Sequence, residues 1–395
     1  MTSAPRWLIL TGELPPVCGG VGDYTALLAS ALAAAGECVT VCSPPGPTEF
    51  LPTSGVEVVS LPDHYGSAAR AALDRLLDRA PCRVLVQYVP QAFGVHGANL
   101  PFCRWLYRRA RRGDDVQVMF HEPYLELSLH PPRALLAILQ RAMAATLIRA
   151  SRRVYVATEA WLPYLHPYAP ASMTVVTLPI PSSIPVVSRS RSLEMLRSEL
   201  LSSGSSLVGH FGTYGDHVRP LVAEVLIAVL QRDTNVAAVC AGEGSHEFVR
   251  ALVRTAPALA PRLHSTGRLP SEDVSLHLQA CDVLVQPYPD GVTTRRTTIM
   301  AALANGRAVV TTDGRLTEPV WRRTKAAMLV PAGDCAALAC AVGRLLDDRH
   351  ARASLAAQAS SIYTAEFAME RTIASLRDHA RPRPIAGSAL SRRTA

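Results

Sequence analysis

The chain has 395 residues, which at about 150 residues per domain corresponds to two or three domains. Hydrophobic residues make up 49% and charged residues 18%, so full cores can form and wholesale disorder is excluded. The formal net charge is +8, with 39 arginines and one lysine, Lys325. Such a bias towards arginine is typical of a GC-rich bacterial genome, because arginine codons are GC-rich. It is therefore weak evidence for an anionic ligand.

Nine scattered cysteines, with no C-x-x-C pair, predict neither a zinc site nor a disulfide framework. We interpret them as reduced, mostly buried residues of a cytoplasmic protein. The apolar stretch 7–10 is too short for the core of a signal peptide and predicts a first strand. No apolar run reaches the length of about 18 residues that a transmembrane helix needs.

Short apolar runs alternate with helical stretches through the first half of the chain. The first helix is expected at 24–35, closed by Gly36. The predicted strands are 7–10, 38–42, 56–60, 84–88, 116–120, 154–157 and 174–178. Regular alternation of strands and helices predicts a parallel sheet covered on both faces.

Residues 179–206 are rich in proline and serine and are interpreted as a linker with one short helix at 193–201. A second alternating series follows, with strands at 207–211, 236–241, 263–266, 283–286 and 308–311 and helices at 221–231, 246–255, 271–280 and 297–305. A last helix is expected at 364–379. The two doubly wound halves should place the carboxyl ends of their strands around a shared cleft, where such sheets bind ligands.

The loop after the first strand contains Gly19, Gly20 and Gly22. These glycines permit close approach of a ligand, and a helix beginning near Asp23 would offer amides to an anion. A plain tight turn capped by Asp23 is the alternative. The pattern G-x-G-x-x-G is absent, which disfavours a nicotinamide dinucleotide.

His121 follows the strand 116–120 and could hydrogen-bond a sugar hydroxyl or a phosphate. A histidine whose hydrogen bonds are satisfied inside the protein is the alternative. Two further strand ends carry glycine turns, 212–215 and 242–244, whose amides could face a phosphate, with Arg219 nearby. Two ordinary strand-to-helix turns would look the same.

The strongest signal is the segment 280–306, where a buried strand leads through a turn into threonines able to cap a helix. Arg295 and Arg296 are expected in the first turn of that helix, where the macrodipole disfavours positive charge. Their position is explained if a diphosphate sits at the helix end. A solvated arginine pair is the alternative.

Together these loops resemble bacterial glycosyltransferases of the GT-B fold, closest to glycosyltransferase family 4. The resemblance spans residues 6 to about 380 and is carried by Gly19–Thr25, His121, Thr174–Pro185 and Ala280–Thr311. It implies an α/β fold of two Rossmann-like domains facing a central cleft. The implied boundaries are 1–182 for acceptor binding, 183–206 for the linker, 207–362 for nucleotide-sugar binding, 363–380 for a helix packing back on the first domain and 381–395 for a basic disordered tail.

The resemblance implies sugar transfer from a nucleotide-diphosphate donor to an acceptor hydroxyl, with retention of configuration, without a metal or other cofactor. Arg295, Arg296 and Arg219 would stabilise the leaving diphosphate, and His121 would hold the donor sugar. The further implied donor-binding residues are Gly19, Gly20, Gly212, Thr213, Gly242, Glu243, Arg268, Leu269, Asp290, Gly291, Thr293, Thr294 and Thr297. Asp23 and Tyr24 would bind the acceptor.

The sequence departs from the family pattern of two glutamates separated by seven residues. Ala301 occupies the second position, and a gap-free count places the first at Thr293, while Asp290 and Gly291 resemble the family's Glu-Gly. No lysine accompanies Arg219. A binding protein that has lost catalysis and a nucleotide-sugar epimerase therefore stay open as alternatives.

The stretch Arg104–Arg112 would place Arg104, Arg108, Arg111 and Arg112 on one helix face. Such a face is most often simply solvated. Peripheral contact with an anionic membrane, at its inner face in a cytoplasmic protein, comes next. The acceptor could be a carbohydrate, lipid-linked or a small molecule. Nucleic acid is disfavoured, because no known binding module is present.

Overall fold

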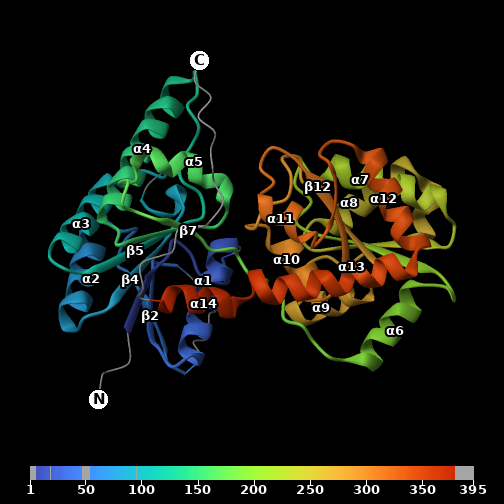
Figure 1. The fold of residues 1–395 in the computed structure, drawn as a ribbon, viewed down its shortest axis with the longest axis horizontal. Coiled ribbons are helices and arrows are strands. Elements are labelled where there is room, and N and C mark those ends of the chain that lie inside the picture. The colour runs from blue at the N-terminus through green and yellow to red at the C-terminus, as the bar shows by residue number, and fades with distance from the viewer. Residues whose placement is uncertain (1–5, 18, 47–53, 95, 379–395) are drawn as a thin grey trace. The chain divides into compact units, whose positions relative to one another are not determined.

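The computed structural model describes residues 6–17, 19–46, 54–94 and 96–378. They form two compact units, each built around its own parallel sheet (Figure 1). Unit 1 includes the described residues up to Ala157, Trp161–Leu178 and those from Thr372 onward. Unit 2 comprises Thr158–Ala160 and Pro179–Arg371.

Unit 1 contains a seven-stranded sheet in the order β3-β2-β1-β4-β5-β6-β7. The strands are β1 (Arg6–Leu10), β2 (Cys38–Ser43), β3 (Val56–Ser60), β4 (Arg83–Tyr88), β5 (Asp115–Phe120), β6 (Arg153–Val156) and β7 (Val175–Thr177). The helices are α1 (Gly20–Ala34), α2 (Ser67–Arg79), α3 (Leu100–Arg111), α4 (Pro131–Ala150) and α5 (Leu162–Leu165), with short turns η1 (Pro90–Ala92), η2 (Glu159–Trp161) and η3 (His166–Tyr168).

Unit 2 contains a six-stranded sheet in the order β10-β9-β8-β11-β12-β13. The strands are β8 (Ser206–Phe211), β9 (Val236–Ala241), β10 (Leu263–Ser265), β11 (Val283–Gln286), β12 (Ala308–Asp313) and β13 (Met328–Pro331). The helices are α6 (Ser190–Leu200), α7 (Arg219–Arg232), α8 (Ser245–Thr255), α9 (Ser271–Ala280), α10 (Thr297–Ala304), α11 (Pro319–Thr324), α12 (Cys335–Asp347), α13 (Arg349–Ile362) and α14 (Met369–Arg377), with the turns η4 (Pro257–Arg262) and η5 (Tyr363–Phe367). Helix α14 passes into unit 1 at Thr372.

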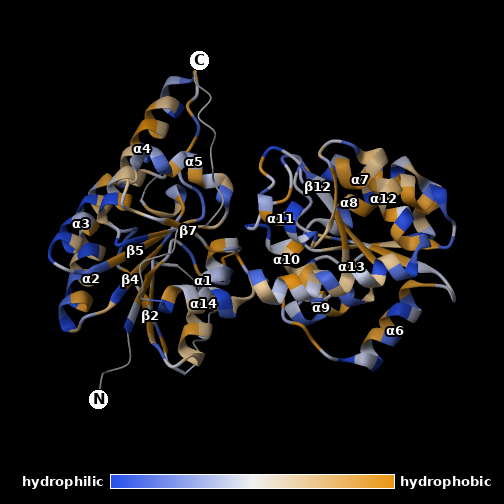
Figure 2. Cartoon of the chain, in the orientation of Figure 1, coloured by the Kyte–Doolittle hydropathy of each residue, from blue (hydrophilic) through white to orange (hydrophobic). Residues whose placement is uncertain are grey.

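Every strand pair in both sheets is parallel, for example β4 with β5 and β8 with β9. The central strands are short apolar runs buried on both faces, which confirms the predicted doubly wound architecture. Hydrophobic residues concentrate along the strands (Figure 2). Strand order reverses between β1 and β4 and between β8 and β11, so the turns after these strands flank the ligand-binding edge expected for such sheets.

The structure corrects several predicted boundaries. The short helix expected at 193–201 is α6 (Ser190–Leu200), and it packs on α9, so residues 183–206 belong to unit 2 and are not a separate linker. The expected helix 364–379 is the π-helical η5 followed by α14, and the edge strand β13 was missed. The proposed tail, 381–395, lies outside the described residues.

Candidate functional site

Three glycine turns of unit 2 are joined at the carboxyl ends of β8, β9 and β10. The amide of Gly212 donates to the carbonyl of Ala241, at 3.0 Å, and the amide of Gly242 donates to the carbonyl of Gly267, at 3.1 Å. The amide of Gly267 in turn donates to the hydroxyl of Ser245, at 2.9 Å. The two predicted glycine turns, at Gly212 and Gly242, therefore form one continuous backbone surface. The turn at Gly267, just before Arg268, extends this surface.

Only glycine fits at position 242. Its φ is +111°, and a Cβ there would lie 2.2 Å from the carbonyl oxygen of Gly212. Gly215, in the same loop as Gly212, has open space around its Cα. Within these two turns, position 242 therefore needs glycine for the close contact with the Gly212 carbonyl, whereas position 215 does not.

The other predicted residues of these turns lie near the surface. Thr213, Glu243 and Arg268 are exposed, and Leu269 is partly buried. Arg219 is the first residue of α7, and its Nη2 lies 3.6 Å from Glu247 Oε1. Its positive charge is therefore partly balanced by a neighbouring carboxylate.

His210, at the end of β8, is buried beneath the turn that begins at Gly212. Its ring meets that of Tyr214 edge-on, with centroids 4.9 Å apart, and its Nδ1 has no hydrogen-bond partner among the described residues. Burial lowers the pKa of His210 to about 3, so the ring is neutral at physiological pH. Sequence analysis gave this histidine no part in the site.

The turn after β11 packs against the turn after β12. Gly291 has φ +92°, and a Cβ there would lie 2.2 Å from Thr317 Oγ1. Asp290 is partly exposed and accepts a hydrogen bond from Arg315 Nε, at 3.0 Å. Asp290 and Gly291 therefore form a rigid corner at the start of the predicted donor loop.

A buried carboxylate that sequence reasoning missed fixes the middle of this loop. Glu318 accepts hydrogen bonds from the amide and the hydroxyl of Thr294 and from the indole of Trp321. It also accepts them from the hydroxyl of Thr158 and the amide of Glu159. Thr294 is therefore held by the protein itself, and its hydroxyl is already occupied. Position 318 lies outside every motif that carried the resemblance.

Thr293, which stands where a gap-free count puts the family's first glutamate, is buried. Its Oγ1 has no hydrogen-bond partner among the described residues. A buried hydroxyl without a partner is unusual in proteins, so the Thr293 side chain is a candidate contact for a bound ligand.

Arg295 and Arg296 come immediately before α10 rather than in its first turn. Arg296 is the N-cap, without a side-chain capping bond, and Thr297 is the first helical residue, so no threonine caps the helix as predicted. The guanidinium of Arg296 lies 4.8 Å from the ring centroid of Tyr288. The Tyr288 hydroxyl is in turn 2.8 Å from Thr298 Oγ1. Arg296 thus stands beside the helix end with its head group supported by an aromatic face.

Ala301, at the position of the family's second glutamate, is fully buried on α10 among core residues such as Ile299 and Trp321. The structure offers no carboxylate at this position. It also explains why alanine is stable there, since a charged group among these apolar side chains would be costly.

In unit 1, α1 begins at Gly20 and not near Asp23. The amide of Gly22 donates to Glu13 Oε1, at 3.2 Å, so the expectation of free amides for an anion is wrong at this position. A Cβ on Gly19 would lie 1.8 Å from the same oxygen, whereas Gly20 has open space. The glycine loop is therefore folded around an internal carboxylate.

His121 is buried at the end of β5, and its Nε2 lies 2.7 Å from Gln87 Oε1. Its backbone carbonyl accepts a hydrogen bond from the Trp161 indole, at 2.8 Å. Tyr24 is also buried and meets the His121 ring edge-on at 5.3 Å, whereas Asp23 is exposed. Gln87, which sequence reasoning did not single out, orients the histidine.

On α3, Arg104, Arg108, Arg111 and Arg112 are exposed, as the predicted face requires. Arg109, within the same stretch, is buried. It binds Asp74, Asp78 and Asp114 at 3.3, 2.8 and 2.6 Å and is therefore a structural residue.

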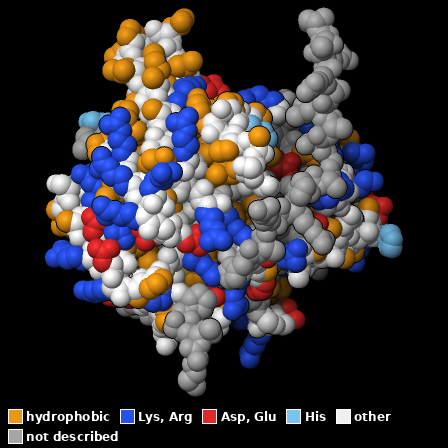
Figure 3. All heavy atoms as spheres, turned by 60° about the vertical axis from the view of Figure 1, so that its left-hand side comes forward, with side chains coloured by type: hydrophobic (Ala, Val, Ile, Leu, Met, Phe, Trp, Pro, Cys, Tyr) orange, Lys and Arg blue, Asp and Glu red, His pale blue; other side chains and the backbone are white. Residues whose placement is uncertain are grey.

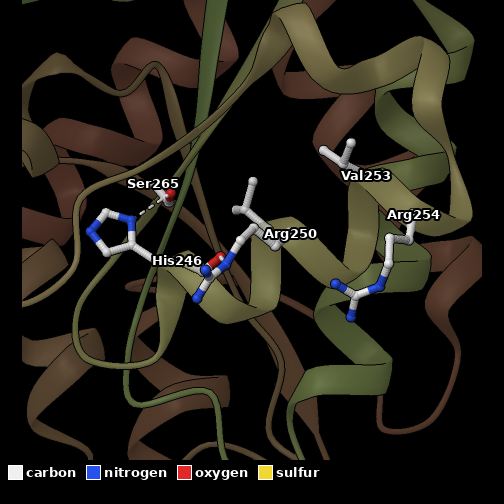
Figure 4. Close-up of a pocket in the computed structure, with 6 residues that line it drawn as sticks. His246, Arg250, Val253, Arg254 and Ser265 are labelled. Carbon is white, nitrogen blue, oxygen red and sulfur yellow. Dashed lines mark hydrogen bonds between the residues drawn. The ribbon is translucent and has the colours of Figure 1, made fainter.

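An open groove of about 610 Å³ runs along the outer face of α8 (Figure 4). It is lined by His246, Val249, Arg250, Val253, Arg254 and Ser265. The ring of His246 is hydrogen-bonded to Ser265, at 2.9 Å, beside the turn at Gly267. The groove thus adjoins the glycine turns but consists mainly of one helix surface.

Neither a metal site nor a membrane span is found in the described part of the chain. Its His, Cys, Asp and Glu residues form no group that could hold a metal ion. No helix there is both long and apolar enough to cross a bilayer. The described cysteines are all free, and Cys18 lies outside the described residues.

The comparisons with known proteins agree with this architecture. Residues 206–348 match the family model for glycosyl transferases group 1. Sucrose-phosphate synthase from Thermosynechococcus elongatus superimposes with a TM-score of 0.70 at 16% identity, covering 94% of this chain and 97% of that chain. HepE of Anabaena, solved in complex with UDP, gives 0.65 at 17% identity, covering 94% and 98%. No curated protein matches the sequence at a significant level.

WaaG, a glycosyltransferase involved in lipopolysaccharide biosynthesis, gives a TM-score of 0.62 at 15% identity, covering 94% of this chain and 99% of that chain. The fold is therefore GT-B, and the match to a glycosyltransferase family model is confined to unit 2.

Proposed function

We propose that this enzyme moves a sugar from a nucleotide-diphosphate donor to an acceptor hydroxyl, with retention and without a metal, in the manner of glycosyltransferase family 4. The observation that carries the proposal is the place of Arg295 and Arg296 before α10. The first turn of this helix holds no acidic residue, and no side chain caps it. A diphosphate there would meet helix amides and two guanidinium groups together.

The difficult step is the build-up of negative charge on the diphosphate as the bond to the anomeric carbon breaks. Arg295 and Arg296, aided by Arg219, would stabilise that charge electrostatically. The glycine surface at Gly212 and Gly242 would let the nucleotide approach the backbone, with Arg268 and Leu269 near the base. His121 would hold the donor sugar.

Several residues prepare this site without touching the donor. Glu318 fixes Thr294 through two hydrogen bonds, and Tyr288 supports Arg296. Because these contacts exist in the free protein, the loop would not have to reorganise when charge develops on the leaving group.

The test is a thermal-shift panel of UDP, GDP, ADP and dTDP, followed by hydrolysis assays with the matching nucleotide sugars. Uridine donors come first, because HepE has been solved with UDP-glucose and shares this fold. A nucleotide that raises the melting temperature, together with hydrolysis of its sugar, supports the proposal. Failure of all four nucleotides to bind contradicts it.

A binding protein without catalysis is the second candidate, favoured by the buried Ala301 in place of the second glutamate. That carboxylate would accept hydrogen bonds from the ribose hydroxyls. Nucleotide binding without turnover across a wide set of acceptors would favour this candidate. Release of an altered free sugar nucleotide would instead favour the epimerase.

We further propose that the enzyme is cytoplasmic and contacts the inner membrane face through the exposed arginines of α3. Exposed guanidinium groups along α3 and at its C-cap would attract anionic lipid or an acidic acceptor. Removing them should weaken binding to anionic vesicles and make no difference with neutral ones.

A further inference from the structure

The end of unit 1 that begins α4 exposes several large apolar side chains. Leu127, Leu129, Leu135 and Ile138 are 64%, 104%, 69% and 57% exposed. We call this region, residues 127–138, the apolar tip. Figure 3 shows hydrophobic side chains gathered on a protruding part of the molecule, and Figure 2 colours this end of α4 as hydrophobic. A single exposed leucine is ordinary, whereas four within twelve residues mark an interaction surface.

The charge around the apolar tip is mainly positive. No acidic residue occurs from Leu127 to Thr158, and the carboxylate just before the tip, Glu126, accepts a hydrogen bond from the Tyr164 hydroxyl, at 3.0 Å. Arg133 is exposed in the first turn of α4, where the helix macrodipole disfavours a cation and no acidic side chain compensates. Lys and Arg side chains also gather below the protruding part in Figure 3. An anionic partner would remove this unfavourable electrostatic term.

Few backbone N–H groups at the start of α4 would lose a hydrogen bond if the apolar tip moved from water into lipid. Pro131 and Pro132 are the first two residues of α4 and carry no N–H group. The amide of Ala134 donates to the carbonyl of His130, at 3.0 Å. Three of the first four helical positions therefore present no unsatisfied donor, and unsatisfied donors are what make most helix ends costly to bury in lipid.

We propose that the apolar tip inserts into the interfacial region of an anionic lipid bilayer, with Arg133 at the level of the head groups. Apolar side chains supply the hydrophobic part of such binding, and the cation supplies the electrostatic part. Helix α3 packs along α4, so the arginines of α3 belong to the same part of unit 1. This inference deepens the membrane contact proposed for α3, and the experiment below separates the two.

The experiment is co-sedimentation of the full chain with vesicles of phosphatidylcholine alone and of phosphatidylcholine mixed with phosphatidylglycerol. We expect binding to the mixed vesicles. The variant Leu129→Ser, Leu135→Ser, Ile138→Ser should lower the partition coefficient by about tenfold or more. The single variant Leu129→Ser alters only a fully exposed side chain. Its partition coefficient should fall less than that of the triple variant, and its melting temperature should be unchanged.

The matched control is Val186→Ser, Met195→Ser in unit 2, which removes comparably exposed apolar side chains and should bind as the wild type does. Arg104→Gln, Arg108→Gln, Arg111→Gln on α3 should make binding weaker while a salt-resistant fraction remains. Failure of the wild type to bind overturns the inference. So does an equal loss in the control, or a loss confined to the α3 variant. A wild-type dimer that the triple serine variant converts to a monomer would instead assign the apolar tip to a second copy of this chain.

Discussion

The carboxylate of Glu318 accepts hydrogen bonds from both the amide and the hydroxyl of Thr294. One side chain thereby fixes the middle of the loop that ends at Arg295 and Arg296. Because Glu318 is buried and has three further donors around it, its role can be tested through stability as well as activity.

Replacing Glu318 with Gln should destabilise unit 2 by about 2–4 kcal/mol, because an amide cannot accept from all five donors. Chemical denaturation followed by tryptophan fluorescence measures this loss. Glu366→Gln is the control, since Glu366 is exposed and its ion pair with Arg323 is long, at 4.0 Å. This variant should change stability by less than about 0.5 kcal/mol. Equal stability of the two variants would contradict the anchoring role.

Replacing Arg296 or Arg295 with Ala should lower donor turnover by about 10²-fold or more, because stabilisation of the leaving diphosphate is lost. Steady-state hydrolysis of the nucleotide sugar identified by the thermal-shift panel measures the effect. Arg323→Ala removes an exposed arginine of the same unit and should leave turnover unchanged. Unchanged kinetics in both variants would remove these arginines from the site.

Gly242→Ala should destabilise unit 2 by at least about 2 kcal/mol, because the new Cβ requires a strained φ and meets the carbonyl of Gly212. Nucleotide binding should weaken with it, since the joined turns would separate. Gly215→Ala, in open space within the same loop, is the matched control. The measurement is the melting temperature of both variants and its rise when nucleotide is added. A Gly242→Ala protein with the wild-type values of both would contradict the close packing of the two turns.

The lowered pKa of His210 predicts that the folded protein loses stability in mild acid. Its folded pKa is about 3, below the value of about 6.5 expected for an unfolded chain, so the unfolded state binds more protons between these values. Stability should therefore fall as the pH drops below about 6.5, by about 2 kcal/mol at pH 5 from this residue. His210→Leu should reduce the difference in unfolding free energy between pH 7.5 and pH 5 by that amount.

The control for this prediction is His217→Gln, which removes an exposed histidine near the same loop. Its stability should depend on pH as that of the wild type does. If His210→Leu also keeps the full acid sensitivity, the buried neutral state of His210 is wrong.

Much of the fold could be predicted because most strands are short apolar runs with helical stretches between them, and both sheets follow from that alternation. The strand β13 was missed because its four residues end in proline and carry no periodicity. Helix α6 was reduced to part of a linker because the prolines before it dominate the composition. Such boundaries depend on packing, here of α6 on α9, which local sequence does not reveal.

Sequence analysis singled out the glycines and arginines of the candidate site but not the groups that support them. Glycine turns and paired arginines stand out at strand ends, so Gly242 and Arg296 could be found by position. Glu318 and Gln87 could not, because each acts on a residue far away in sequence, on Thr294 and His121 respectively. Long-range hydrogen bonds of this kind leave no local pattern.

The carboxylate of Glu13, which accepts a hydrogen bond from the amide of Gly22, affects which ligands this loop of unit 1 can bind. The Glu13 carboxylate already lies at the N-terminal, positive end of α1. It would therefore repel a phosphate at this position. Neutral hydroxyl groups face no such repulsion and can still share the carboxylate as a hydrogen-bond acceptor. We therefore expect this loop to favour neutral hydroxyl groups over a phosphate.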